Sequence, residues 1–307
     1  MSKLLGVLLF LWLTSIASAT IVYLGPELGE SAGFTLLALN DGTMIIDSAT
    51  SIVGDVGYSN GVVSNTNQKV DSFTGTVYVH SGATFSDTPA TFAPSGGFVI
   101  GGAADTHLNH ANTDAAAAAA FFAGLAAGPG VAVSSLGSVT GSLNLTSTAD
   151  VNVFDLTSVN LNSQTWTLNG SATDLFVFRV SGNLDWSQSQ TILNGVSANQ
   201  IVFYFANASS IDINKSPTVF DGTILAPTGS VIYHNPATFN GAIIAENIDV
   251  HSDFNIFGGQ GGMVQAIPES STFVLLGTAL VGVGLVRPRR KQSGQSFERT
   301  HDTSLAA

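Results

Sequence analysis

The chain has 307 residues, of which 33 are glycine, none is cysteine and only 10% are charged. This composition excludes a coiled coil, a highly charged disordered chain and a disulfide-stapled miniprotein, and the lack of thiols excludes thiolate zinc sites, iron–sulfur clusters and cysteine nucleophiles. Between residues 20 and 267, three basic residues stand against 18 acidic ones, a net charge of −15 that disfavours binding to nucleic acids or to anionic membranes.

The N-terminus carries the pattern of a secretory signal peptide. Lys3 precedes an apolar run at residues 4–13, and the small residues Ala17 and Ala19 follow at the spacing of a cleavage site. We therefore predict that residues 1–19 are removed during export and that the mature chain begins at residue 20.

From residue 34 onward, short β-branched and aromatic runs alternate with Gly, Asn, Ser and Asp, which is the pattern of strands separated by turns. Residues 220–226 and 239–245 form the clearest internal repeat, with an Asx-Gly corner in both copies. A repeat of about 20 residues is typical of coils stacked on one another, where each strand pairs in parallel with its equivalent in the next coil. The sequence therefore predicts a mainly β fold, a parallel β-solenoid over residues 20–257, with an antiparallel sandwich as the alternative.

One helix interrupts the strands. Residues 115–120 are six consecutive alanines, the residue with the highest helix propensity. Thr113 or Asp114 can cap its start and residues 128–130, Gly-Pro-Gly, end it. We predict an Ala-rich α-helix of about three turns that packs along the solenoid.

A Gly-rich linker at residues 258–267 leads to an uncharged apolar run at residues 272–286, which a basic cluster closes. As a helix this run reaches about 22 Å, which is short of the roughly 30 Å hydrocarbon core of a bilayer. The segment is therefore a marginal membrane span, and the basic residues after it favour a cytoplasmic end.

The same region resembles the PEP-CTERM sorting tail of Gram-negative bacteria. The resemblance rests on the motif residues before and after the apolar run, which are Pro268, Glu269, Arg289 and Arg290. It implies that residues 268–291 are a sorting or transmembrane segment, that residues 292–307 are a polar tail, and that export and sorting machinery handles the chain. The expected location is the cell surface or the exterior of a Gram-negative bacterium, with transient anchoring by the C-terminal helix.

Several motifs in the middle of the chain resemble the ice-binding-like family of secreted microbial proteins. These are residues 34–38, residues 50–57 with their Ile-x-Gly-Asp-Val-Gly corner, the Ala-rich helix, residues 175–180 and residues 220–226. The resemblance implies an irregular right-handed β-solenoid with a helix alongside. A second resemblance, to choice-of-anchor A adhesin-like domains, rests on residues 153–156, 181–182 and 224–227, and the choice between the two families remains open.

The resemblance implies a non-catalytic protein that binds ice through a flat face of the solenoid. Such a face needs small, regularly spaced outward side chains, and stacked strands supply that spacing. The candidates are Thr165, Thr167, Ser187, Ser189, Thr191 and Thr223. The alternative is an adhesin-like matrix or cell-surface protein that binds glycans or exopolysaccharide.

A polysaccharide-active enzyme is a third hypothesis. It would need converging carboxylates, for which Asp155, Asp174 and Asp185 are candidates, but nothing in their spacing marks a pair. His107 and His110 have helical spacing for a metal, but polar surroundings favour a solvated helix face. We therefore predict no catalytic residues, no metal and no cofactor.

Overall fold

The structure is a computed structural model that describes residues 28–258, except residues 41, 47, 60–61, 64–68, 86–93, 208, 235–236 and 252–253. The expected signal peptide, the linker beyond residue 258, the sorting segment and the polar tail lie outside the described residues. Within the described part of the chain, no helix is long and apolar enough to cross a membrane.

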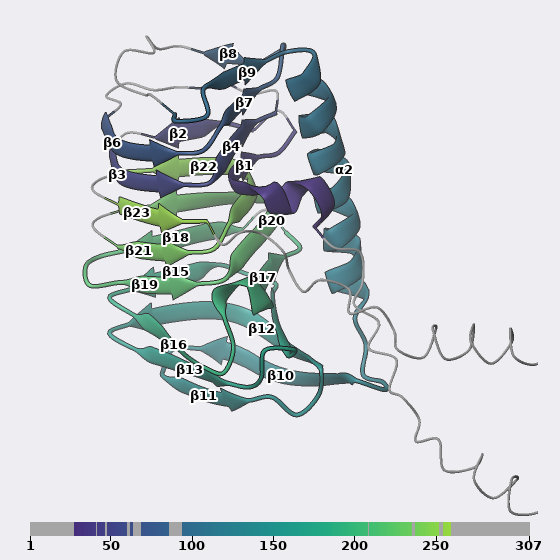
Figure 1. Ribbon diagram of the computed structural model, residues 1–307. Helices are drawn as coiled ribbons and strands as arrows, with labels where there is room; N and C mark the ends of the chain where they lie inside the picture. The colour runs from purple at the N-terminus through teal and green to yellow at the C-terminus, as the bar shows by residue number, and fades with distance from the viewer. Residues whose placement is uncertain are drawn as a thin grey trace, which may run out of the picture. The chain divides into compact units, whose positions relative to one another are not determined.

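The strands stack as coils in three rows, with the helix α2 (Ala103–Gly124) alongside (Figure 1). The first row contains β1 (Phe34–Ala38), β4 (Asp55–Tyr58), β7 (Val77–Val79), β9 (Phe98–Ile100), β14 (Leu175–Val180), β17 (Ile201–Phe205) and the first halves of β10 (Val131–Val139), β12 (Val151–Asn162), β20 (Thr223–Tyr233) and β22 (Ile243–Val250). The second row contains the second halves of those four strands with β2 (Met44–Ile46), β5 (Val62–Val63), β8 (Thr84–Phe85), β15 (Leu184–Ser187) and β18 (Ser210–Asn214). These two rows form one 15-stranded sheet.

The third row is a separate 8-stranded sheet. Its strands, in spatial order, are β11 (Leu143–Thr146), β13 (Thr165–Asn169), β16 (Gln190–Asn194), β19 (Val219–Asp221), β21 (Thr238–Asn240), β23 (Phe254–Phe257), β3 (Ser48–Val53) and β6 (Lys69–Thr74). Short 3₁₀ turns at Gly29–Gly33 (η1) and Ala198–Gln200 (η3) complete the described secondary structure.

Neighbouring strands pair in parallel, as the internal repeat predicts. Phe220 pairs with Phe239 and Ile224 pairs with Ile243, so the two copies of the repeat lie directly on one another. The prediction of a mainly β, parallel fold with one helix is confirmed, and the antiparallel sandwich is wrong.

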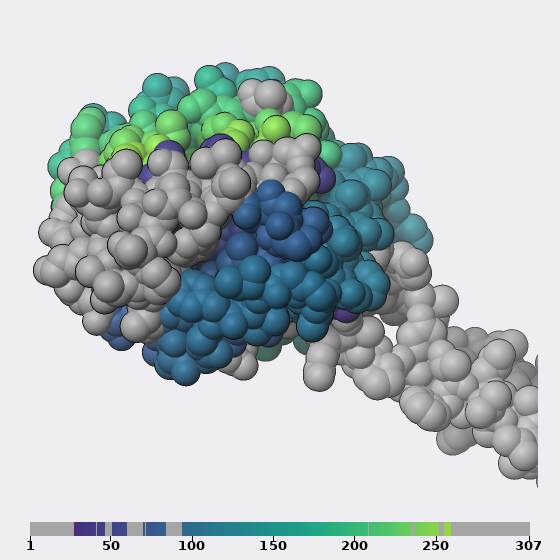
Figure 2. Space-filling model, turned by 90° about the horizontal axis from the view of Figure 1, so that it is seen from above, coloured from purple at the N-terminus to yellow at the C-terminus, as the bar shows by residue number. Residues whose placement is uncertain are grey.

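The order of the coils along the stack differs from their order in the chain. The chain first builds the coils of β1 to β9, and α2 then runs back along the first row (Figure 1). The later coils return toward the start, so that β22 pairs with β1 and β23 pairs with β3. These pairings between the first and last coils hold the two parts of the stack together. The end of the stack at which β7, β9 and the start of α2 lie is shown in Figure 2.

Helix α2 has 22 residues and begins at Ala103, well before the alanine run. The predicted start at Thr113 or Asp114 is wrong, because a buried stripe at helical spacing already begins with Ala104, Leu108 and Ala111. Polar residues on the other side of these turns hide that stripe in the sequence. The small buried side chains let α2 pack closely against the first row.

The core between the rows is aromatic. Phe178 and Phe203 stack at 4.7 Å between ring centroids on adjacent coils, and Phe220 and Phe239 stack at 5.2 Å. Such pairs each contribute roughly 0.5–1.5 kcal/mol beyond the burial of their area. The repeated stacking makes the coils a rigid support for the side chains on the outside.

Candidate functional site

The outward side of the third row is the candidate site. On β13, Trp166 and Leu168 are fully buried in the core, while the alternate residues Thr165, Thr167 and Asn169 are partly exposed. Because side chains alternate along a strand, the parallel register repeats this division on each neighbouring strand. The outward residues therefore form straight columns along the stack.

The columns follow from the strand register and from the alternation of burial. The first contains Thr165, Gln190, Val219, Thr238, Asn255, Ser51 and Ser72, and the second contains Asn144, Thr167, Ile192, Asp221, Asn240, Phe257, Val53 and Thr74. The place of Asp221 beside Ile192 extends the pairing of Gln190 with Val219 by two residues, and Asp221 is the one buried member of the two columns. We call this surface the neutral face. Strands lie about 4.8 Å apart and alternate residues about 6.6 Å apart, so eight strands make an array roughly 34 Å long.

Among the described side chains of the neutral face, Asp221 is the only charged one. It is 7% exposed, because Thr191 donates its hydroxyl proton to one carboxylate oxygen and the Asn240 amide donates to the other, at 2.7 Å. The remaining described side chains offer methyl, hydroxyl and amide groups and the exposed ring of Phe257. Among the side chains that the structure describes on these two columns, none therefore presents a charge to solvent.

Hydrogen bonds between coils fix the outward side chains. The amide of Asn194 donates to Asn169 at 2.9 Å, and the amide of Asn169 donates to Asn144 at 2.7 Å. Gln190 donates to the Thr165 hydroxyl at 3.3 Å. These ladders restrict the rotamers at one end of the neutral face and hold its side chains in register.

The structure places Thr165 and Thr167 on the neutral face, but not the other four candidates. Ser187 is 3% exposed on the second row and donates to Asp185, while Ser189 is fully buried at a corner and donates to the Ser187 carbonyl. The expected outward orientation is wrong for both, because these hydroxyls satisfy polar groups at the bend between two rows.

The expected outward orientation is also wrong for Thr191 and Thr223. Thr191 pairs with Trp166 in an inward column and is 7% exposed. Thr223 is 5% exposed at the start of β20, in register with Val202 of the first row. Neither hydroxyl belongs to the neutral face.

Sequence reasoning missed most residues of the neutral face, although one signal was available. Phe220 and Phe239 occupy equivalent inward positions of the repeat, which places their neighbours Val219 and Thr238 outward. Reading the flanks of the repeat in this way would have identified the middle of the face.

The second row has a different surface. Its outward residues include Asp185 and Asp212, which pair on adjacent strands, and Asp249, whose carboxylate lies 2.8 Å from Nε2 of His251. The second row is therefore acidic, in contrast to the described side chains of the neutral face.

The three carboxylates considered for catalysis lie at different places. Asp155 forms an ion pair with Arg179 on the first row. Asp174 accepts a hydrogen bond from the Ser171 amide of its own turn at 2.8 Å, and Asp185 lies on the second row. The structure does not bring them into one cleft.

His107 and His110 both contact Glu30, which comes from η1. The distances from their Nδ1 atoms to the Glu30 oxygens are 2.5 Å and 3.0 Å. These hydrogen bonds, that of His110 first, lower the pKa of Glu30. The described residues contain no group of three His, Asp or Glu side chains arranged to hold a metal ion. The cluster docks η1 on α2.

Comparison with known proteins gives a family match over most of the chain. The model of a family described as "Putative Ice-binding-like adhesive domain" matches residues 30–256. The chain is 34% identical over 82 residues to an ice-binding protein of Flavobacterium frigoris, and 34% identical over 68 residues to ice-binding protein K3-B1 of Typhula ishikariensis. These stretches cover 26% and 22% of the chain and only 28% and 27% of the relatives.

Solved structures resemble the whole fold. An ice-binding protein from Antarctomyces psychrotrophicus superposes with a TM-score of 0.52 at 21% identity, covering 76% of this chain and 98% of that one. The ice-binding protein domain of Shewanella frigidimarina gives a TM-score of 0.52 at 22% identity, covering 76% of this chain and 97% of that one. At this identity the likeness establishes a shared fold.

Proposed function

Because the chain belongs to the ice-binding-like adhesive domain family, we propose that it binds ice through the neutral face. The observation that carries this proposal is the array itself, whose described side chains present no charge to solvent, are held by hydrogen bonds and stand on a rigid aromatic core. Ice-binding proteins are also among the relatives and the structural neighbours.

The physical basis is the ordering of water. Apolar groups restrict the orientation of the first layer of water, and hydroxyl and amide groups can anchor that layer. On the neutral face both kinds of group recur at fixed spacings, for example Thr167 beside Ile192 and Thr238 beside Asn255. A layer ordered in this way can merge with a growing ice surface without the displacement of hydrated charges.

The rest of the proposal concerns processing and location. Residues 1–19 act as a signal peptide, residues 20–257 form the binding domain, residues 258–267 link it to a PEP-CTERM-like segment at 268–291, and residues 292–307 follow as a polar tail. The family likeness supports a right-handed winding of the coils, with a choice-of-anchor A domain as the related alternative. The protein then acts outside the cell or at its surface, without catalysis.

Adhesion is the second candidate function, because the family is described as adhesive as well as ice-binding-like. In this reading the partner is a glycan or exopolysaccharide.

The ice proposal is tested with the purified protein by measuring thermal hysteresis, inhibition of ice recrystallisation and incorporation into a slowly grown ice hemisphere. We expect all three activities to rise with concentration and a labelled protein to enter the ice. Exclusion of folded protein from the ice, with no hysteresis at any attainable concentration, would refute the proposal.

A further inference from the structure

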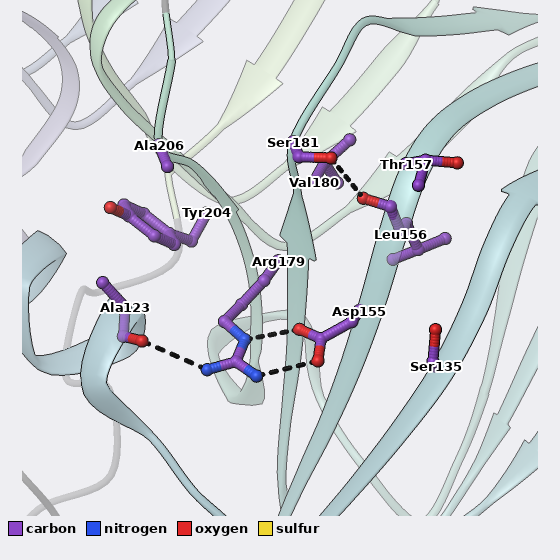
Figure 3. A pocket seen from close by; sticks show the side chains of 10 residues that line it. All are labelled: Ala123, Ser135, Asp155, Leu156, Thr157, Arg179, Val180, Ser181, Tyr204 and Ala206. Carbon is purple, nitrogen blue, oxygen red and sulfur yellow. Dashed lines mark hydrogen bonds and ion pairs between the residues drawn. The ribbon is translucent and has the colours of Figure 1, made fainter.

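A cavity of about 320 Å³ lies beside the C-terminal end of α2 on the first row (Figure 3). The residues that matter for its chemistry are Ser135, Asp155, Thr157, Arg179, Ser181 and Tyr204. This volume is at the lower end of the roughly 300–1,000 Å³ of small-molecule sites. The cavity therefore suits one small ligand, or one residue of a chain that continues into solvent.

The cavity exists because α2 is shorter than the row it covers. Its 22 residues span about 33 Å, whereas ten strands of the first row span about 43 Å. The last coils at the β10 end therefore extend beyond the helix. There the register aligns Ser135, Asp155, Arg179 and Tyr204 on successive strands.

The charges of the cavity are balanced. Arg179 donates from Nε and Nη2 to the two oxygens of Asp155, at 2.6 Å and 2.9 Å. Its Nη1 donates to the carbonyls of Leu125 and Ala123 at the end of α2, at 2.7 Å and 3.2 Å. Because the carboxylate and the negative helix end neutralise the guanidinium, the site favours neither an anion nor a cation.

Tyr204 supplies an aromatic wall. It is 8% exposed, and burial raises the pKa of its phenol while the Arg179 charge lowers it. Within the described part of the chain, its hydroxyl and that of Ser135 make no hydrogen bond, whereas the Thr157 hydroxyl lies 2.9 Å from the Ser138 hydroxyl. The cavity thus combines an aromatic surface with donors and acceptors that still have capacity for a ligand.

We propose that this cavity binds one uncharged pyranose residue of a glycan. The apolar face of such a ring can pack against Tyr204, while its hydroxyl groups can bond to Asp155, Arg179 and Ser135. The site lies on the first row, away from the neutral face, so the proposal goes beyond ice binding and stands without it. A protein with both surfaces would hold a glycan and ice at the same time.

The test is a titration of the whole protein with uncharged methyl glycosides of glucose, galactose and mannose, followed by saturation-transfer NMR and calorimetry. A ligand of this size gains little energy per atom, so we expect a dissociation constant on the order of 1 mM for at least one sugar. Methyl glucuronide, which carries a carboxylate, should bind more weakly. Equal or tighter binding of the glucuronide would overturn the assignment of a neutral ligand.

Two matched variants locate the binding. Ser135→Leu fills the cavity from an exposed strand position, and Asn160→Leu makes the same change at an exposed position of the second row. We expect Ser135→Leu to weaken binding at least ~10-fold and Asn160→Leu to leave it unchanged, with circular dichroism and melting temperature as checks on folding. Absence of saturable binding by the wild-type protein, or equal affinity in the two variants, would overturn the proposal.

Discussion

Thr238 lies near the middle of the neutral face, between Val219 and Asn255 in the same column. In Thr238→Lys, the neighbours at about 4.8 Å along the column and 6.6 Å along the strand leave no gap into which the lysine could fold. Its ammonium group would therefore stand above the face. Pressing an unpaired charge against ice removes part of its hydration, which costs several kcal/mol. A penalty of about 3 kcal/mol corresponds to a loss of roughly 150-fold in the adsorption constant.

The assay is thermal hysteresis as a function of protein concentration, with the ice-hemisphere experiment beside it. Ser210→Lys is the matched control, because it adds the same charge at an exposed strand position on the second row. We expect Thr238→Lys to require more than about 100 times the wild-type concentration for equal activity, and Ser210→Lys to behave as the wild type. If the folded Thr238→Lys protein kept full activity, the neutral face would not be the surface that contacts ice.

Three further predictions concern stability. Arg179→Ala removes two bonds to the end of α2 and should destabilise the fold by about 2–4 kcal/mol, seen in calorimetry as a fall of roughly 5–15 °C in melting temperature. Hydrogen bonds from His110 and then His107 lower the pKa of Glu30 in the folded protein below its unfolded value of 4.5. The ionised carboxylate therefore stabilises the fold fully at pH values above 4.5. This stabilisation should be lost as the pH falls through the lower folded pKa of Glu30. The measurement is the free energy of unfolding by urea of the wild type and of Glu30→Gln, between about pH 7 and about pH 3. A difference between the two free energies that stayed constant over this range would disprove the prediction. Thr191→Val leaves Asp221 with one partner fewer, so it should cost about 1–2 kcal/mol in urea unfolding while thermal hysteresis stays at the wild-type level.

The stacking of coils could be predicted because its signal is local. The repeat at residues 220–226 and 239–245 places a phenylalanine before each Asx-Gly corner, and the two rings meet at 5.2 Å. An inward aromatic residue followed by a tight turn fixes both the face of the strand and the position of the bend. The parallel register follows from those two constraints.

The closure of the stack could not be predicted in this way. Leu36 pairs with Ile243, and no pattern near either residue shows that the first coil would lie on the last. The prediction that Ser187, Ser189 and Thr191 all point outward on one face was wrong for a related reason. They read as alternating positions of one strand, but Gln188 has a φ of 47° and turns the chain. Ser187 and Thr191 therefore belong to different rows.

The distribution of charge favours the third row over the other two as the surface of the proposed ice contact. Helix α2 covers most of the first row, and the second row presents Asp185, Asp212 and Asp249, whose hydration shells resist removal. Adsorption of the second row would require these carboxylates to shed water or to be protonated, whereas the described exposed side chains of the neutral face impose no such cost. If the chain binds ice as proposed, the acidic residues of the second row therefore direct adsorption to the third row. It follows that replacing acidic residues of the second row with neutral ones would remove this preference, even though no residue of the neutral face had changed.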